Sequence, residues 1–322
     1  MIERNLLFMK LSLVVPCFNE EENVQRFYDE VNKSFNGIVG NYEIVFVNDG
    51  STDKTGENLR KIFNEASSRV QVLSFSRNFG KEAAIYAGLS NAKGDLVCII
   101  DADLQQHPNV VVEMLKVMSE DDSIDCVAAY QEERKESKLM SGVKSAFYKL
   151  INKIADVDFV NGASDFRLMK RPMVDAVISM SERHRFSKGI FSWVGFNTKY
   201  IPYEVKEREF GETKWGFWKL FKYAIDGIVA FSTFPLKIAT GVGLASSILS
   251  VAYLMFVVFQ KLLLGIDVPG YATIVVLVLF LGGMQLFCLG LLGEYVSKIY
   301  IQSKNRPIYI LKEHLNAEER QD

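Results

Sequence analysis

The sequence has little of what characterises nucleic-acid-binding or disulfide-bonded secreted proteins. Its 37 Lys and Arg residues are balanced by 39 Asp and Glu residues, so the formal net charge is -2. A basic stripe of the kind that follows a phosphate backbone is missing, and nucleic acid is therefore not expected as a partner. The four cysteines are scattered, with no C-x-x-C pair and no metal-ligand spacing. We therefore expect reduced cysteines in a cytosolic setting.

The N-terminal segment lacks the small-residue cleavage site of a signal peptide. It reads MIERNLLFMKLSLVVP, an apolar run that Lys10 interrupts. We interpret it as leading into the first strand of a sheet. With 322 residues, the chain is long enough for one large domain and a further module.

Residues 11 to about 130 alternate short apolar runs with amphipathic stretches. This alternation predicts βαβ units, and hence an α/β domain with a mostly parallel sheet. Where the first strand ends, Asn19 and Glu22 have the spacing of a capping box for the next helix. The predicted strands lie near 11–15, 43–48, 71–75, 96–100 and 124–130.

The strongest chemical signal lies where the fourth predicted strand ends in Asp101-Ala102-Asp103-Leu104-Gln105. Five apolar residues precede it, as in a strand that is covered on both faces. In continued strand geometry Asp101 and Asp103 point to one side with Cα atoms roughly 7 Å apart, at the edge where open α/β sheets bind ligands. Two carboxylates and the amide of Gln105 suit Mg²⁺ or Mn²⁺ that is also held by substrate phosphates. Capping of the next helix is the alternative for a lone D-x-D motif.

Other strand ends bring further polar residues to this edge. Glu20 follows the first strand and either faces a nucleotide or serves the local structure. Asp49 follows the second, where it can accept the imide N–H of a uracil ring or hold its turn together. Lys81 follows the third, and a cation near a helix N-terminus is expected to face an anion. Asp165 comes after small residues, a pattern that an ordinary Asx turn also explains.

The last third of the chain predicts membrane attachment. Two apolar segments, about 236–259 and 271–292, each exceed the roughly 20 residues that span a bilayer. The aromatic residues and lysines just before them predict a helix in the membrane interface, with a core-packed helix as the alternative. The tail is basic, so the positive-inside rule places it and the large domain in the cytoplasm. The expected parts are a catalytic domain 1–212, an interfacial helix 213–234, a hairpin 235–295 and a basic tail 296–322.

Several segments together resemble one family, the inverting family 2 glycosyltransferases, and specifically the bactoprenol (undecaprenyl phosphate) glucosyltransferases. They are also similar to dolichyl-phosphate mannose synthases. The resemblance covers nearly the whole chain, hairpin and tail included. The segments are PCFNEEEN, VNDGSTDKT, SFSRNFGKEAAI, DADLQQHP, NGASDFRLM, EREFGETKW, FSTFPLKI and GLLGEYVSKIY followed by RPIYI.

The resemblance implies a GT-A fold and transfer of one sugar, glucose by default, from a UDP-sugar to undecaprenyl phosphate with inversion. It also implies a bacterial inner-membrane, multi-pass protein that self-associates, a tetramer being one expected form. Carried over by position, the site residues are Asp101, Asp103 and Gln105 for the metal, Pro16, Glu20, Asp49, Lys81 and Asp101 for the nucleotide sugar, Arg134, Arg208 and Lys214 for the acceptor phosphate, and Asp165 with Asp103 for catalysis.

Two positions depart from the family pattern and put substrate detail in doubt. Asn48 stands where many members have an Asp, and Gln106-His107 replaces a commoner acidic residue. N-acetylglucosamine, galactose and mannose remain alternative sugars. A processive polysaccharide synthase is disfavoured because the Q-x-x-R-W motif and further spans are missing. A membrane scaffold that binds a nucleotide sugar without turnover is the alternative from a different class.

Overall fold

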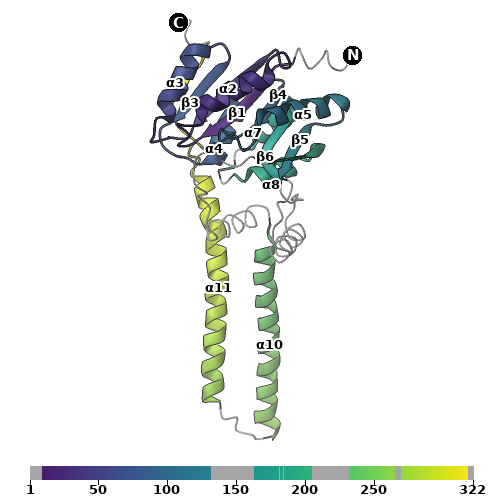
Figure 1. Cartoon of the computed structure of the whole chain (residues 1–322). Helices are drawn as coiled ribbons and strands as arrows, with labels where there is room; N and C mark the ends of the chain where they lie inside the picture. Colours follow the sequence, from purple (N-terminus) through teal and green to yellow (C-terminus); the bar gives the residue numbers. More distant parts are fainter. Residues whose placement is uncertain are drawn as a thin grey trace. The chain divides into compact units, whose positions relative to one another are not determined.

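The computed structural model describes residues 9–131, 163–180, 182–183, 185–204, 232–264 and 270–317 (Figure 1). They divide into two compact units. One is a sheet domain, which also takes in the residues from Arg306 onward, and the other contains the two long helices near the C-terminus. Each unit is described by itself below.

The sheet domain is built on one mixed sheet with the strand order β7-β5-β6-β4-β1-β2-β3-β8. Strands β4, β1, β2 and β3 run parallel in its centre, while β6 and β8 are antiparallel to their neighbours β4 and β3. All five predicted strands are confirmed to within two residues at either end. The strands are β1 (Leu11–Cys17), β2 (Tyr42–Asn48), β3 (Val70–Phe75), β4 (Leu96–Ile99), β5 (Cys126–Gln131), β6 (Ala163–Lys170), β7 (Thr198–Tyr203) and β8 (Leu311–Leu315).

Helices cover both faces of the central strands, which explains why these strands read as continuous apolar runs. Phe27 of α2 packs edge-on against Phe46 of β2, with 6.0 Å between ring centroids. On the other face α4 approaches β1 closely, since a Cβ on Gly88 would lie 2.2 Å from the Cγ1 of Val14. The helices are α2 (Val24–Phe35), α3 (Thr55–Ala66), α4 (Lys81–Asn91), α5 (Pro108–Glu120), α7 (Arg171–Ser179) and α8 (Ser187–Trp193).

The predicted capping box at Asn19 and Glu22 is wrong. Helix α2 begins at Val24, and Asn23 occupies its N-cap position without a side-chain cap bond. Asn19 has a φ of 56°, a left-handed conformation that Asn tolerates better than most residues, so the chain is still turning there. Its side-chain oxygen accepts a hydrogen bond from the backbone N–H of Thr52 (2.9 Å) and joins the two loops that follow β1 and β2.

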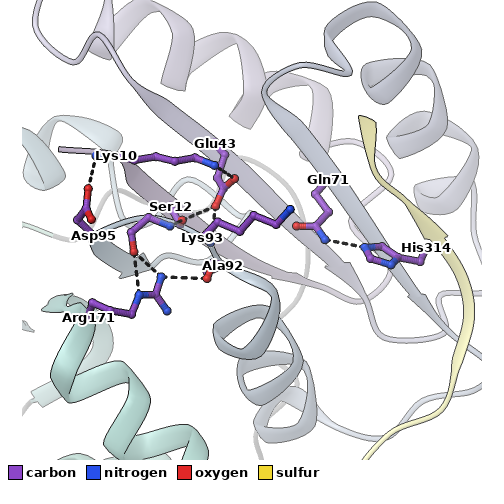
Figure 2. A network of polar contacts seen from close by, with 10 residues as sticks. Lys10, Ser12, Glu43, Gln71, Ala92, Lys93, Asp95, Arg171 and His314 are labelled. Atoms are coloured by element: carbon purple, nitrogen blue, oxygen red, sulfur yellow. Dashed lines mark hydrogen bonds and ion pairs between the residues drawn. The ribbon is translucent and has the colours of Figure 1, made fainter. Parts of the chain in front are cut away.

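The edge of the sheet at the amino ends of the strands is closed by a polar network (Figure 2). Glu43 accepts hydrogen bonds from the side chain of Lys10, the hydroxyl of Ser12 (2.5 Å) and the backbone N–H of Lys93 (2.7 Å). Arg171 at the start of α7 donates to the carbonyl of Ala92 (2.9 Å). The polar side chains named here are therefore hydrogen-bonded within the protein.

The C-terminal tail supplies a strand that the sequence analysis did not predict. Strand β8 pairs antiparallel with β3, and Glu313 forms an ion pair with Arg60 of α3 (2.9 Å). Gln71 and His314 lie 2.6 Å apart between the side-chain nitrogens across this pair (Figure 2). Just before the strand, Tyr309 stacks on Phe75 with ring centroids 5.0 Å apart. The edge of β3 is thereby covered, as exposed sheet edges usually are.

The second unit contains two long apolar helices, α10 (Phe234–Leu264) in green and α11 (Tyr271–Ser303) in yellow in Figure 1. Candidate spans cover Phe234–Gln260 and Thr273–Ser303, with mean hydropathy of 2.2 and 2.5. Ser246 of α10 lies 3.4 Å from the sulfur of Met284 of α11. The two predicted apolar segments are thus confirmed as helices long and apolar enough to cross a membrane. The predicted interfacial helix 213–234 lies outside the described residues, apart from its last three positions.

Candidate functional site

The carboxyl ends of the parallel strands form the candidate site, because β6 brings an acidic residue to the same edge. In the β4–β6 pair Ile99 lies opposite Arg167 and Leu96 opposite Lys170. Continuing this antiparallel register by two residues places Asp165 opposite Asp101. Asp165 itself lies within β6.

Lys81, the first residue of α4, joins the two acids. Its ammonium lies 2.7 and 2.8 Å from the two carboxylate oxygens of Asp101, and 3.6 Å from Oδ2 of Asp165. Burial alone would lower the pKa of Lys81, but Asp101 and Asp165 outweigh it and raise this pKa above its ordinary value. Lys81 is therefore a permanent cation that faces anions, as its position after β3 predicted.

Asp101 and Asp103 lie in a tight turn that is fixed from within. The side chain of Gln106 accepts from the backbone N–H of Asp101 (3.0 Å) and donates to Oδ2 of the same residue (3.3 Å). Asp103 accepts the backbone N–H of Gln105 (3.1 Å), and Leu104 has a left-handed φ of 58°. Gln106 thus orients the first acid of the motif.

This turn suits a hard divalent cation. It presents two carboxylates, and Mg²⁺ and Mn²⁺ are commonly held by one or two such groups together with substrate phosphates. Within the described part of the chain, no group of three or more His, Cys, Asp or Glu side chains is arranged to hold a metal by itself. For Gln105 the structure shows a role for the backbone N–H, and metal binding by its side chain stays a prediction.

Asp165 is a partly buried acid, and one of its carboxylate oxygens has no hydrogen-bond partner in the described part of the chain. Among the described residues, its Oδ1 atom is buried and has no hydrogen-bond partner. Burial raises the pKa of Asp165, but Lys81, Lys188 and Arg167 have the larger combined effect and lower it below its ordinary value. A charged carboxylate oxygen without a protein partner is the kind of group that meets a substrate.

Asp49 holds the loop that leads to Lys81. Its two carboxylate oxygens accept the backbone N–H groups of Phe79 (2.6 Å) and Gly80 (2.9 Å). Burial raises the pKa of Asp49 in spite of these bonds. Next to it, Gly50 has a φ of 66°, and a Cβ there would lie 2.3 Å from the carbonyl carbon of Arg77. The turn-holding role is therefore observed, and contact with a uracil ring stays a prediction.

Glu20 and Pro16 lie at the same edge. Pro16 pairs with Val47 inside the β1–β2 ladder. The backbone N–H of Glu20 donates to the hydroxyl of Thr55 (2.8 Å), and its carboxylate accepts from the side chain of Asn23 (2.6 Å). These contacts fix the loop, and a nucleotide-facing role for either residue stays a prediction. The predicted acceptor-phosphate residues Arg134, Arg208 and Lys214 lie outside the described residues.

Sequence reasoning missed Glu82 and Tyr203. Glu82, next to Lys81, accepts the backbone N–H of Ser187 (2.9 Å) and also its hydroxyl. Burial, and secondarily Asp165, raise the pKa of Glu82 to about 7. Burial also raises the pKa of Tyr203, against the opposing effect of the Ser164 and Gln106 side chains. No local motif marks either residue, because the partners come from distant parts of the chain.

Comparison with known proteins agrees with this geometry. Residues 12–178 match the model of glycosyl transferase family 2, and residues 234–299 match the GtrB C-terminal hairpin. A bactoprenol glucosyl transferase of Shigella phage SfV is 43% identical, over 94% of this chain and 98% of that protein. A prophage bactoprenol glucosyl transferase homolog of Escherichia coli K12 is 42% identical, over 94% and 99%.

Among solved structures, glucosyl-3-phosphoglycerate synthase from Mycobacterium tuberculosis, in complex with Mn²⁺, UDP-glucose and phosphoglyceric acid, has a TM-score of 0.46. It is 18% identical and covers 71% of this chain and 80% of its own, a likeness too distant to bear on chemistry. The mixed sheet with helices on both faces is GT-A-like. The chain belongs to glycosyl transferase family 2 and carries the C-terminal hairpin of the GtrB type.

Proposed function

We propose that this protein moves one sugar, glucose by default, from a UDP-sugar to undecaprenyl phosphate with inversion at the anomeric carbon. The observation that carries the proposal is the cluster in which Lys81 joins Asp101 at the end of β4 to Asp165 on β6. Relatives named bactoprenol glucosyl transferase, at 42–43% identity over 94% of the chain, support the substrates. The two apolar helices suit an enzyme whose acceptor is a membrane lipid.

The donor would bind along the carboxyl ends of β1, β2 and β4. Pro16, Glu20 and Asp49 would line the nucleotide pocket, and Asp101 and Asp103, with Gln105, would hold Mg²⁺ or Mn²⁺. When bound, the metal neutralises charge on the leaving nucleoside diphosphate. The rigid turn around Asp101 would orient the donor without ordering the loop anew in each cycle, since Gln106 already fixes it.

The acceptor phosphate is already ionised at neutral pH, so it needs positioning more than deprotonation. Lys81 offers a cation beside Asp165, and Arg134, Arg208 and Lys214 would add positive charge around the lipid phosphate. In-line attack by a phosphate oxygen behind the anomeric carbon is a single displacement. It therefore inverts the configuration of the sugar.

Asp165 would orient the acceptor or stabilise positive charge that develops on the sugar. Its lowered pKa keeps it ionised, and a carboxylate with a low pKa is a weak general base at neutral pH. Its Oδ1 atom is buried and has no hydrogen-bond partner among the described residues, which leaves it available for a contact with the substrates. Asp165→Asn should therefore lose most transfer activity and retain donor binding. Near-normal turnover by this variant, with donor binding intact, would refute the assignment.

The proposed location is the bacterial inner membrane, with α10 and α11 as spans and the sheet domain in the cytoplasm. A homo-oligomer is part of the same proposal. The weakly charged connection between the helices and the basic tail support this orientation through the positive-inside rule.

The deciding experiment measures transfer of radiolabel from a panel of UDP- and GDP-sugars to undecaprenyl phosphate in detergent. EDTA-treated enzyme and Asp103→Ala are the controls, because both should lose metal-dependent transfer. Label in the lipid from one donor identifies the reaction and the sugar together, and discriminates glucose from N-acetylglucosamine, galactose and mannose. Nucleotide binding without label from any donor would instead favour the non-catalytic scaffold.

A further inference from the structure

The ammonium of Lys81 contacts the carboxylate of Asp101, which the proposed metal would also bind. It lies 2.7 Å from Oδ1 and 2.8 Å from Oδ2 of Asp101, so it faces both oxygens at once. Oδ2 accepts a further hydrogen bond from the side chain of Gln106 (3.3 Å). Little of this carboxylate is left for a second cation while Lys81 is in place.

A divalent cation bound to Asp101 would lie very close to the ammonium of Lys81. Mg²⁺ binds carboxylate oxygens at about 2.0–2.1 Å, which puts a metal on either oxygen within a few ångströms of the ammonium. Repulsion between like charges at that separation is strong in a partly buried site, where solvent screens it poorly. We propose that Lys81 and the divalent metal compete for Asp101, and that metal binding transfers the Lys81 ammonium to a phosphate of the substrates. This inference rests on the proposed function through the metal-binding role of Asp101.

The surroundings of Lys81 allow this transfer without a backbone movement. The bonds from Asp49 to Phe79 and Gly80 fix the chain just before α4. The Lys81 side chain is 46% exposed and has a flexible four-carbon stem, so its ammonium can move while its Cα stays in place. Asp165, 3.6 Å away, keeps a negative charge beside the ammonium after Asp101 is released.

The competition makes metal and nucleotide binding cooperative. Without a nucleotide, the metal must displace Lys81 from Asp101 and so binds with reduced apparent affinity. A diphosphate gives the displaced ammonium a new anionic partner and removes part of that cost. By linkage, the metal strengthens nucleotide binding by the same factor. Lys81 is in this view a positioning residue that couples the two ligands.

The test measures Mn²⁺ affinity of the full-length protein in detergent, from the electron paramagnetic resonance signal of free Mn²⁺, with and without UDP. Without UDP, Lys81→Met should bind Mn²⁺ about fivefold more tightly than wild type, the factor expected for loss of an ion pair worth about 1 kcal/mol. UDP should then strengthen Mn²⁺ binding less in Lys81→Met than in wild type. Lys81→Arg keeps the charge and should stay close to wild type.

Lys188→Met is the matched control, since it removes a second positive charge that acts on Asp165. Its Mn²⁺ affinity without UDP should change by less than about twofold, because direct contact outweighs distant charge. Lys81→Gln, which keeps polar contacts with the acids, is a second neutral variant in case Lys81→Met fails to fold. Equal or weaker Mn²⁺ binding by a folded neutral variant overturns the inference, and so does an equal gain in Lys188→Met. Transfer by the wild-type protein is a separate readout. Absence of label from any donor, together with tighter Mn²⁺ binding by Lys81→Met, would count against the proposed function alone.

Discussion

Replacement of Glu82 by Gln should make the protein more stable at alkaline pH and change its pH dependence. The Glu82 carboxylate lies in the first turn of α4, where Ser187 donates both a backbone N–H and a hydroxyl to one of its oxygens. Burial raises its pKa from the ordinary 4.5 to about 7, with a further contribution from Asp165. A Gln side chain keeps an oxygen that can accept the bonds from Ser187 but carries no charge to bury.

The direction and the size of this change in stability follow from proton linkage. The folded protein holds the Glu82 proton up to about pH 7, whereas the unfolded chain releases it near pH 4.5, so stability falls as pH rises between these values. The loss levels off above pH 7 at about 3 kcal/mol, since each unit of pKa corresponds to about 1.4 kcal/mol. For a domain of this size, that energy corresponds to roughly 6–12 °C in the unfolding midpoint.

The assay is scanning calorimetry of the detergent-solubilised protein between pH 5 and pH 8. Glu82→Gln should match wild type at pH 5 and unfold at a higher temperature at pH 8. Glu57→Gln, at an exposed position in the first turn of α3, is the control and should run parallel to wild type. Parallel curves for Glu82→Gln and wild type would refute the reasoning.

Further predictions concern the turn beside Asp49, the proposed metal site and the tail. Gly50→Ala should lower the unfolding midpoint far more than Gly37→Ala, because both have positive φ but only the former meets backbone atoms; equal calorimetric shifts would contradict this. Asp103→Ala should abolish the strengthening of UDP binding by Mn²⁺ in titration calorimetry while the unfolding midpoint stays near that of wild type. Tyr309→Leu should speed amide hydrogen exchange in β3, because it removes the ring stacked on Phe75; unchanged exchange would show that this ring does not hold the tail.

The sequence predicted the central sheet and one edge of the site well, for local reasons. Each central strand is a short apolar run that ends in polar residues, and the parallel arrangement sends all these ends to the same edge. Asp49, Lys81 and Asp101 could therefore be grouped from the order of strands and polar residues along the chain. The structure adds how they are joined, with Asp49 fixing the backbone before Lys81 and Lys81 reaching Asp101.

What could not be predicted depends on contacts between distant residues. Glu82 is unremarkable in the sequence, and its burial follows from Ser187, 105 positions away. Strand β8 reads LKEHL, which is too polar for a strand signal. It forms because the edge of β3 would otherwise be unpaired, and because Arg60 bonds to Glu313, 253 positions further along the chain. The prediction of a capping box at Asn19 was wrong for the opposite reason. The local pattern was suitable, but the side chain of Asn19 accepts a hydrogen bond from the distant Thr52 instead.

The pairing of β3 with β8 also restricts how the chain can be threaded through a bilayer. Strands that share backbone hydrogen bonds lie on one side of any membrane, so the segment between Phe75 and Leu311 must cross it an even number of times. If α10 and α11 are the segments that cross, they therefore cross together, and a deletion of either one would separate β8 from its partner strand. A topology reporter placed between the two helices thus reads the orientation of both.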